Sequence, residues 1–178
     1  TVTDANTCSN SRPVTVTVNP LPTVSISGND TICIGDTTTL TASGGTGYAW
    51  SNGPLTAGNT VNPTSTTSYT VTVTDANTCR NTASQSVVVN ALPVLSFTGQ
   101  DTVCNGDTTQ ITVSGGSSYV WTHGPTTALV DLSPSTNTYY SVVATDSNGC
   151  SNADSVQIFV NALPSVTITG NDSICLGD

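Results

Sequence analysis

The chain has 178 residues, of which only 7% are charged, whereas about 25% is usual in globular domains. The 11 acidic residues are all aspartates, the two basic residues are Arg12 and Arg80, and the net charge is −9. This balance excludes nucleic acids and anionic membrane surfaces as partners, because clusters of Lys and Arg are needed to bind phosphate groups.

The sequence repeats itself with a period of 71 residues. This interval separates the cysteines within two sets of three: Cys8, Cys79 and Cys150, and Cys33, Cys104 and Cys175. Connectors with the sequence Asn-Pro-Leu-Pro or Asn-Ala-Leu-Pro join the copies, and their prolines make each one short, stiff and extended. The predicted domains are the C-terminal part of one repeat (1–22), two complete repeats (23–93 and 94–164) and the N-terminal part of another (165–178). A chain that begins and ends inside repeats is expected to be a window cut from a longer protein.

Small polar and apolar residues alternate with period two along the first complete repeat, which is typical of half-buried β-strands. We predict strands at 23–28, 37–43, 48–51, 68–74 and 84–90, a turn-rich corner at 29–36, and one or two edge strands within 55–63. The alternation places six side chains on the buried faces: Leu40, Ala42, Trp50, Tyr69, Val71 and Val73. No segment has helical periodicity. The expected fold class is all-β, with each repeat an antiparallel seven-stranded sandwich.

Four segments of this repeat, at 31–36, 40–45, 48–50 and 69–79, carry a resemblance: Thr-Ile-Cys-Ile-Gly-Asp, Leu-Thr-Ala-Ser-Gly-Gly, Tyr-Ala-Trp, and the strand and turn that end in Cys79. They resemble the Ig-like and PKD-like tandem repeats of giant surface adhesins and filament proteins that Bacteroidota export by type IX secretion. The resemblance implies Ig-like sandwiches in a linear array, located outside the cell or on its surface.

Six cysteines in such a chain predict disulfide bonds rather than a metal site, because no Cys-x-x-Cys pair is present. In an Ig-like sandwich, Cys33 precedes the second strand and Cys79 follows the sixth, so they lie at opposite poles, roughly 20 Å apart. A disulfide requires Cα atoms within about 7 Å of each other. We therefore favour a bond between successive repeats, Cys33–Cys150, and keep within-repeat pairing, Cys33–Cys79 and Cys104–Cys150, as the alternative. The other cysteines would then pair outside this window or stay open.

The residues do not predict an enzyme, and no catalytic residue is assigned. With one histidine, no Glu and no Lys, the repeats share no acid–base pair. His123 stands where the other copy has Asn52, and we interpret it as an exposed turn residue. Trp50 and Trp121 are expected in the cores, although they would be stacking residues if the repeats bound glycans.

An Asp-x-Asn pattern recurs in the turn after the sixth strand, at Asp75 and Asn77 and at Asp146 and Asn148. These oxygens suit calcium, which is therefore a candidate ion, and an Asx turn is the alternative. Too few carboxylates cluster to supply six or seven ligands, so no metal site and no cofactor is assigned.

Aspartate is followed by Thr or Ser at regular places, several of them beside the corner at 29–36 and its equivalents. This pattern resembles the O-glycosylation acceptor of exported Bacteroidota proteins. The candidate acceptors are Thr31, Thr37, Thr102, Thr108, Ser155 and Ser173.

These observations favour a structural role. We expect a stalk or filament segment of a large extracellular surface protein, concerned with adhesion, attachment or gliding, that acts as a rigid spacer. The expected partners are neighbouring repeats of the same chain, with no nucleic acid and no membrane insertion in this window. Because flat, neutral β surfaces associate readily, a homo-oligomer or filament bundle is a further hypothesis. The alternative function is a glycan- or ligand-binding adhesin module that uses the loops at one pole.

Overall fold

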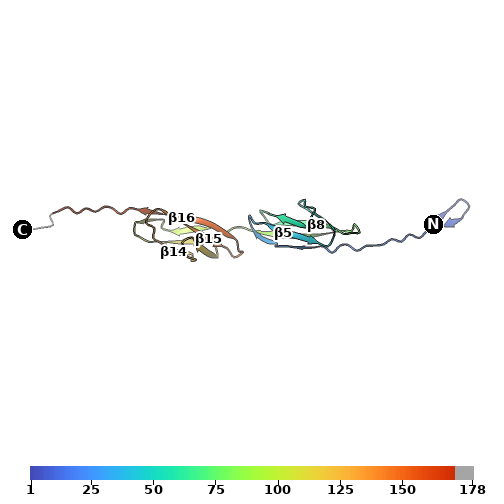
Figure 1. Cartoon of the computed structure of the whole chain (residues 1–178), viewed down its shortest axis with the longest axis horizontal. Helices are drawn as coiled ribbons and strands as arrows, with labels where there is room; N and C mark the ends of the chain where they lie inside the picture. The colour runs from blue at the N-terminus through green and yellow to red at the C-terminus, as the bar shows by residue number, and fades with distance from the viewer. Residues whose placement is uncertain (171–178) are drawn as a thin grey trace, which may run out of the picture. The chain divides into compact units, whose positions relative to one another are not determined.

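The computed structural model describes residues 1–170, which divide between two compact units, the first ending at Val89 and the second beginning at Asn90. Each unit contains one two-layered β-sandwich (Figure 1). In this described part of the chain there is no helix, and hence none that could cross a membrane. The all-β, Ig-like sandwich fold is therefore confirmed. The division between Val89 and Asn90 falls at the start of the predicted connector, and the four domain boundaries stay predictions.

The sandwich of the first unit has seven strands in two sheets. The three-stranded sheet has the order β3-β5-β7, with β3 at Ser25–Ser27, β5 at Thr38–Ser43 and β7 at Gly58–Val61. The four-stranded sheet has the order β4-β9-β8-β6, with β4 at Thr31–Cys33, β9 at Arg80–Asn90, β8 at Thr67–Thr74 and β6 at Gly47–Trp50.

The second unit repeats this topology with an unchanged register. Its sheets have the orders β10-β12-β14 and β11-β16-β15-β13. Their bounds are β10 Ser96–Gly99, β11 Thr102–Cys104, β12 Thr109–Ser114, β13 Ser118–Trp121, β14 Leu129–Leu132, β15 Thr138–Thr145 and β16 Ser151–Asn161. The pair Ser25↔Ser43 recurs as Ser96↔Ser114, 71 residues further along both strands. A further hairpin, β1 (Val2–Thr3) with β2 (Ser9–Asn10), precedes the first sandwich in the sequence.

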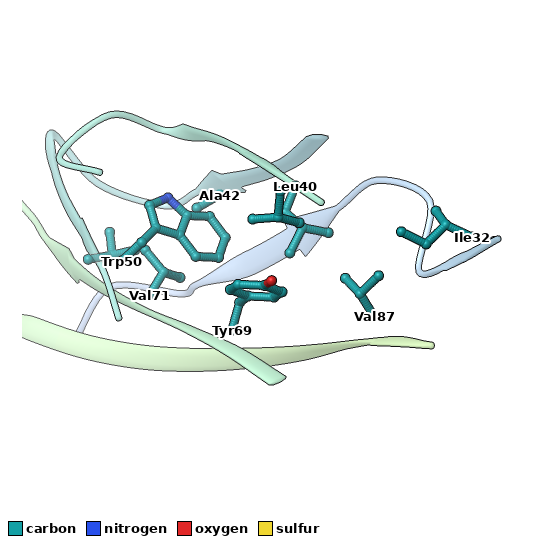
Figure 2. Packing of buried hydrophobic residues seen from close by; sticks show 9 residues of the cluster. Ile32, Leu40, Ala42, Trp50, Tyr69, Val71 and Val87 are labelled. Carbon is teal, nitrogen blue, oxygen red and sulfur yellow. The ribbon is translucent and has the colours of Figure 1, made fainter. Parts of the chain in front are cut away.

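Each sandwich has its own hydrophobic core, formed by the inward-facing residues of its two sheets. In the first, β5 buries every second residue, and all six side chains predicted to face inward are buried. Figure 2 shows Leu40 and Tyr69 pointing toward each other between the layers, with Ile32 at one end of the core. The second core is built around Trp121, Ile111 and Leu132, and the two cores share no residue.

Two of the predicted segments differ from the structure. The corner at 29–36 contains a short strand, β4, that joins the four-stranded sheet beside β9 and buries Ile32. Strand β9 begins at Arg80 rather than at residue 84, because it pairs with all eight residues of β8. The region 55–63 was predicted to hold one or two edge strands, and it holds one, β7.

Candidate functional site

The cysteines lie in two kinds of turn. The first kind follows the short strand at the edge of the four-stranded sheet, β4 in the first repeat and β11 in the second. Cys33 ends β4 and Cys104 ends β11. In each turn the backbone amide of the aspartate three residues later donates to the cysteine carbonyl, at 3.0 Å from Asp36 and 3.0 Å from Asp107. The glycine between them has φ of 95° in both copies, a conformation that a side chain would strain. The two cysteines are therefore held by the same local structure.

The second kind of turn connects the last two strands and is organised by an aspartate. The Asp75 carboxylate accepts hydrogen bonds from the amides of Asn77 and Cys79, both at 2.9 Å. In the second repeat, Asp146 accepts from Asn148 at 2.8 Å and from Cys150 at 2.9 Å. These are Asx turns, in which the aspartate replaces a backbone acceptor. Each turn holds its cysteine immediately before the last strand.

The cysteines differ in oxidation state although their turns match. Cys33 and Cys150 are both disulfide-bonded. Among the described residues, Cys8, Cys79 and Cys104 are free thiols. Cys175 lies outside the described residues. The predicted presence of disulfide bonds is confirmed, and the two cysteines of the favoured bond are the ones that are oxidised.

The within-repeat pairing is wrong, since it requires Cys79 and Cys104 to be oxidised and both are thiols. The geometry of the second repeat gives the reason. Cys104 lies opposite Asn161 at the end of β16, whereas Cys150 directly precedes the first residue of that strand. Eleven residues of extended strand separate these positions, which is roughly 35 Å at about 3.3 Å per residue. A disulfide tolerates about 7 Å between Cα atoms. The prediction that the two cysteines of a repeat lie at opposite poles was correct. The poles are further apart than the roughly 20 Å expected, because the last strand, with eleven residues, is longer than that estimate assumed.

Each connector is held to the sandwich that follows it. The Asn81 side-chain amide donates to the Pro22 carbonyl at 2.9 Å, and Asn152 donates to Pro93 at 3.0 Å. Both prolines are buried. Sequence reasoning missed these asparagines, although their recurrence two residues after a cysteine in both copies was a signal. The hydrogen bonds make each connector proline part of a folded unit.

The remaining predicted site residues lie apart from these turns or have structural roles. Within residues 1–170, no three His, Cys, Asp or Glu side chains are grouped so that they could hold a metal ion. The hydroxyl-bearing candidates for glycosylation are exposed where described: Thr31, Thr37, Thr102, Thr108 and Ser155. Ser173 lies outside the described residues. Glycosylation therefore stays a prediction.

The two tryptophan side chains are buried in the cores of their sandwiches. Trp50 is 4% exposed and Trp121 is 1% exposed. Their indole Nε1 atoms donate to backbone carbonyls in the same sandwich, at 3.1 Å to Thr56 and 3.0 Å to Thr127. His123 is exposed, as predicted, and its ring lies edge-on to that of Trp121 at 5.7 Å. The two tryptophans are therefore not accessible to a glycan.

No family model matches the chain, and no curated protein matches it. Among solved structures, it is similar to a bacterial ice-binding adhesin of 1.5 MDa, at 14% identity and a TM-score of 0.38, over 82% of this chain and 67% of that one. It is similar to murine CEACAM1b at 14% identity and a TM-score of 0.33, over 79% and 100% of the two chains. A third similarity is to SGBP-B of the Bacteroides ovatus mixed-linkage glucan utilization locus, solved with a heptasaccharide. There the identity is 14% and the TM-score 0.25, and the match covers 83% of this chain but less than half, 46%, of that one.

Proposed function

We propose that the chain is a load-bearing spacer segment of a large extracellular surface protein. In this proposal, successive repeats are joined twice: by a short proline connector and by a disulfide between Cys33 of one repeat and Cys150 of the next. The segment would hold an adhesive or attaching part of the protein at a distance. Type IX export, filament formation and O-glycosylation belong to the same proposal and rest on the resemblance in the motifs.

The observation that carries the proposal is the oxidation state of the cysteines. Cys33 belongs to the first repeat and Cys150 to the second, and both are disulfide-bonded. Within its own repeat, Cys33 could pair only with Cys79, and Cys150 only with Cys104. Both Cys79 and Cys104 are thiols. A disulfide that connects two repeats would carry tension past the strands that lie between Cys33 and Cys150 in the sequence, since a covalent bond does not yield when a β-sheet opens. Disulfides form and persist outside the cell, which supports the extracellular location.

The connector supports the same role. Strand β9 ends at Asn90, and Pro93 is already buried and hydrogen-bonded to Asn152. Only Ala91 and Leu92 lie between these two fixed points. A connector of two residues next to a proline has little conformational freedom compared with a flexible linker. A stiff connection of this kind suits a spacer.

The chemistry of the chain favours a structural role over catalysis. Its one histidine is an exposed ring beside Trp121, and neither Glu nor Lys is present to form a recurring acid–base pair. We accordingly infer that the segment is not an enzyme. Its partners in the proposal are further repeats of the same kind.

One proteolysis experiment tests the disulfide. Trypsin cleaves after Lys and Arg except before proline, so the Arg12–Pro13 bond resists it and Arg80–Asn81 is the one susceptible bond. The oxidised chain is alkylated under denaturing conditions at low pH and then digested. If Cys33 is bonded to Cys150, fragments 1–80 and 81–178 remain joined until a reductant is added. If pairing is within repeats, the two fragments separate without reduction, and the proposal fails.

A further inference from the structure

The outer face of the four-stranded sheet differs between the two repeats. In the second repeat, four large apolar side chains on this face are exposed: Val120 (57%), Tyr139 (66%), Val143 (42%) and Phe159 (42%). A residue next to each of them along its strand belongs to the core or packs against it. Because side chains alternate between the two faces of a strand, these four point away from the core.

The first repeat shows that the sandwich does not require these side chains. At the equivalent positions, 71 residues earlier, it has Ala49, Ser68, Thr72 and Val88. Its four-stranded sheet nevertheless has the same strand order and the same register. The second repeat thus carries large apolar side chains beyond those that its fold needs, and clusters of exposed apolar residues mark sites of interaction.

Strand pairing brings these side chains together. Val143 lies directly opposite Val120 on one neighbouring strand and directly opposite Ala153 on the other, so the three form a row across β13, β15 and β16. Tyr139 and Phe159 are diagonal neighbours on β15 and β16, about 7–8 Å apart. We call these five residues the apolar face of the second repeat.

The apolar face lies on an uncharged surface, although the chain has a net charge of −9. The outward-facing residues of β13, β15 and β16 are Ser, Thr, Asn, Gln, Ala, Val, Tyr and Phe, with no aspartate and no arginine among them. Net charge of one sign keeps copies of a protein apart. Two copies that meet through this surface bring no like charges together, so it suits a second copy of the same chain.

The size of this surface is sufficient for a small interface. The sheet has four strands, and its longest pairing covers eight residues of each strand. At about 4.8 Å between strands and 3.4 Å per residue, the surface measures about 500 Å². Two copies would then bury about 1,000 Å² in total, which is where specific interfaces begin. Two sheets can pack face to face in this way about 10 Å apart.

We propose that the apolar face of the second repeat binds the same face of a second copy of this chain. The pair has two-fold symmetry, because the same surface is used on both copies. The inference rests on the proposed function, since lateral pairing of spacer segments is a first step toward the filament included there. The first repeat, with Ser68 and Thr72 at the equivalent positions, stays unpaired.

Sedimentation of the full chain in an analytical ultracentrifuge tests the pairing. The free thiols are alkylated first under native conditions, so that every dimer observed is non-covalent. We expect a reversible equilibrium between monomer and dimer, with a Kd in the micromolar range. A chain that stays monomeric at about 1 mM has a Kd weaker than that and overturns the inference.

Variants that borrow residues from the first repeat place the interface. Tyr139→Ser with Val143→Thr should raise the Kd at least about tenfold, and Phe159→Val alone should raise it about three- to tenfold. Each introduced residue already occurs in the same strand register in the first repeat, and NMR spectra confirm that the variants fold. The matched control, Ser68→Ala with Thr72→Ser, should leave the Kd unchanged. An unchanged Kd in both variants of the second repeat, or an equal rise in the control, overturns the proposed surface.

Two further readouts separate this inference from its alternatives. A chain that is monomeric but is retained on cellulose, with Tyr139→Ser abolishing retention, would show that the face binds a glycan and would refute the pairing. Digestion of the same samples without reduction reports the peptide that links Cys33 to Cys150. Its absence refutes the proposed function, whereas its presence in a chain that does not dimerise refutes this inference alone.

Discussion

The glycine that lies against the connector gives the sharpest test of how each repeat is attached. Gly115 has φ of 107°, and a Cβ atom placed on it would overlap the backbone carbonyl of Val94, the residue after the connector's last proline. Gly124 has φ of 115°, and nothing lies within 4 Å of the position that a Cβ atom would take there. The variants Gly115→Ala and Gly124→Ala therefore share the backbone strain and differ in the overlap.

The magnitudes follow from this difference. Alanine at such a positive φ costs about 1–3 kcal/mol in either variant. In Gly115→Ala the start of the repeat must also move, because a backbone carbonyl cannot rotate away as a flexible side chain can. We expect a loss of about 1–2 kcal/mol for Gly124→Ala and about 3–5 kcal/mol for Gly115→Ala. The larger loss should be accompanied by weakening of the hydrogen bond from Asn152 to Pro93, which adjoins Val94.

Hydrogen exchange followed by NMR measures the loss in each repeat separately. The amides of Ile111 and Val142, both buried in the second core, report that repeat, and those of Leu40 and Val71 report the first. The first-repeat amides should be unchanged in both variants. Equal losses for the two substitutions would refute the close approach of the turn to the connector.

Three further changes test the structure of the individual repeats. Thr78 has φ of 66°, and the second repeat has Gly149 at the equivalent position. Thr78→Gly should therefore stabilise the first repeat by about 0.5–1 kcal/mol, and Gly149→Thr should destabilise the second. Urea unfolding measures both changes, and opposite signs would contradict the strain at Thr78. Asn52→Ala removes both amide hydrogen bonds to the buried Asn59 and should lower the free energy of unfolding by about 1–3 kcal/mol. Adding Asn59→Val, the residue type of the second repeat, should restore most of this loss. Additive losses in the double-mutant cycle would count against the pairing. Leu40→Ala should lower the free energy of unfolding of the first repeat by about 2–5 kcal/mol, and a loss spread equally over both repeats would contradict separate cores.

The burial pattern was predictable from the sequence because strands alternate strictly between two faces. Leu40 and Val71 belong to strands in which buried residues alternate with more exposed ones, so burial of one face determines the whole segment. Strand β4 was not predictable in this way. Its three residues lie between turn residues, and Ile32 is buried because a distant strand, β9, lies beside it. Pairing over such a sequence distance leaves no local signal.

The cysteine turns were predictable in part. The order of the strands places Cys33 and Cys79 at opposite poles whatever their exact lengths, which is why within-repeat pairing was disfavoured from sequence. The asparagines that hold the connectors were not predictable, since an amide side chain at the start of a strand can equally point into solvent. Asn152 has its role because Pro93 lies within hydrogen-bond distance, 59 residues away in the sequence.

Single-molecule stretching of the chain from its two ends tests the proposed path of load most directly. If Cys33 is bonded to Cys150, the roughly 116 residues between them cannot extend, and reduction should release about 400 Å of additional contour length at about 3.5 Å per residue. The account predicts that the residues between Cys33 and Cys150 stay unextended under oxidising conditions and extend only after a reductant is added. The same extension with and without the reductant would show that the sandwiches themselves bear the tension, and the spacer joint proposed above would be contradicted.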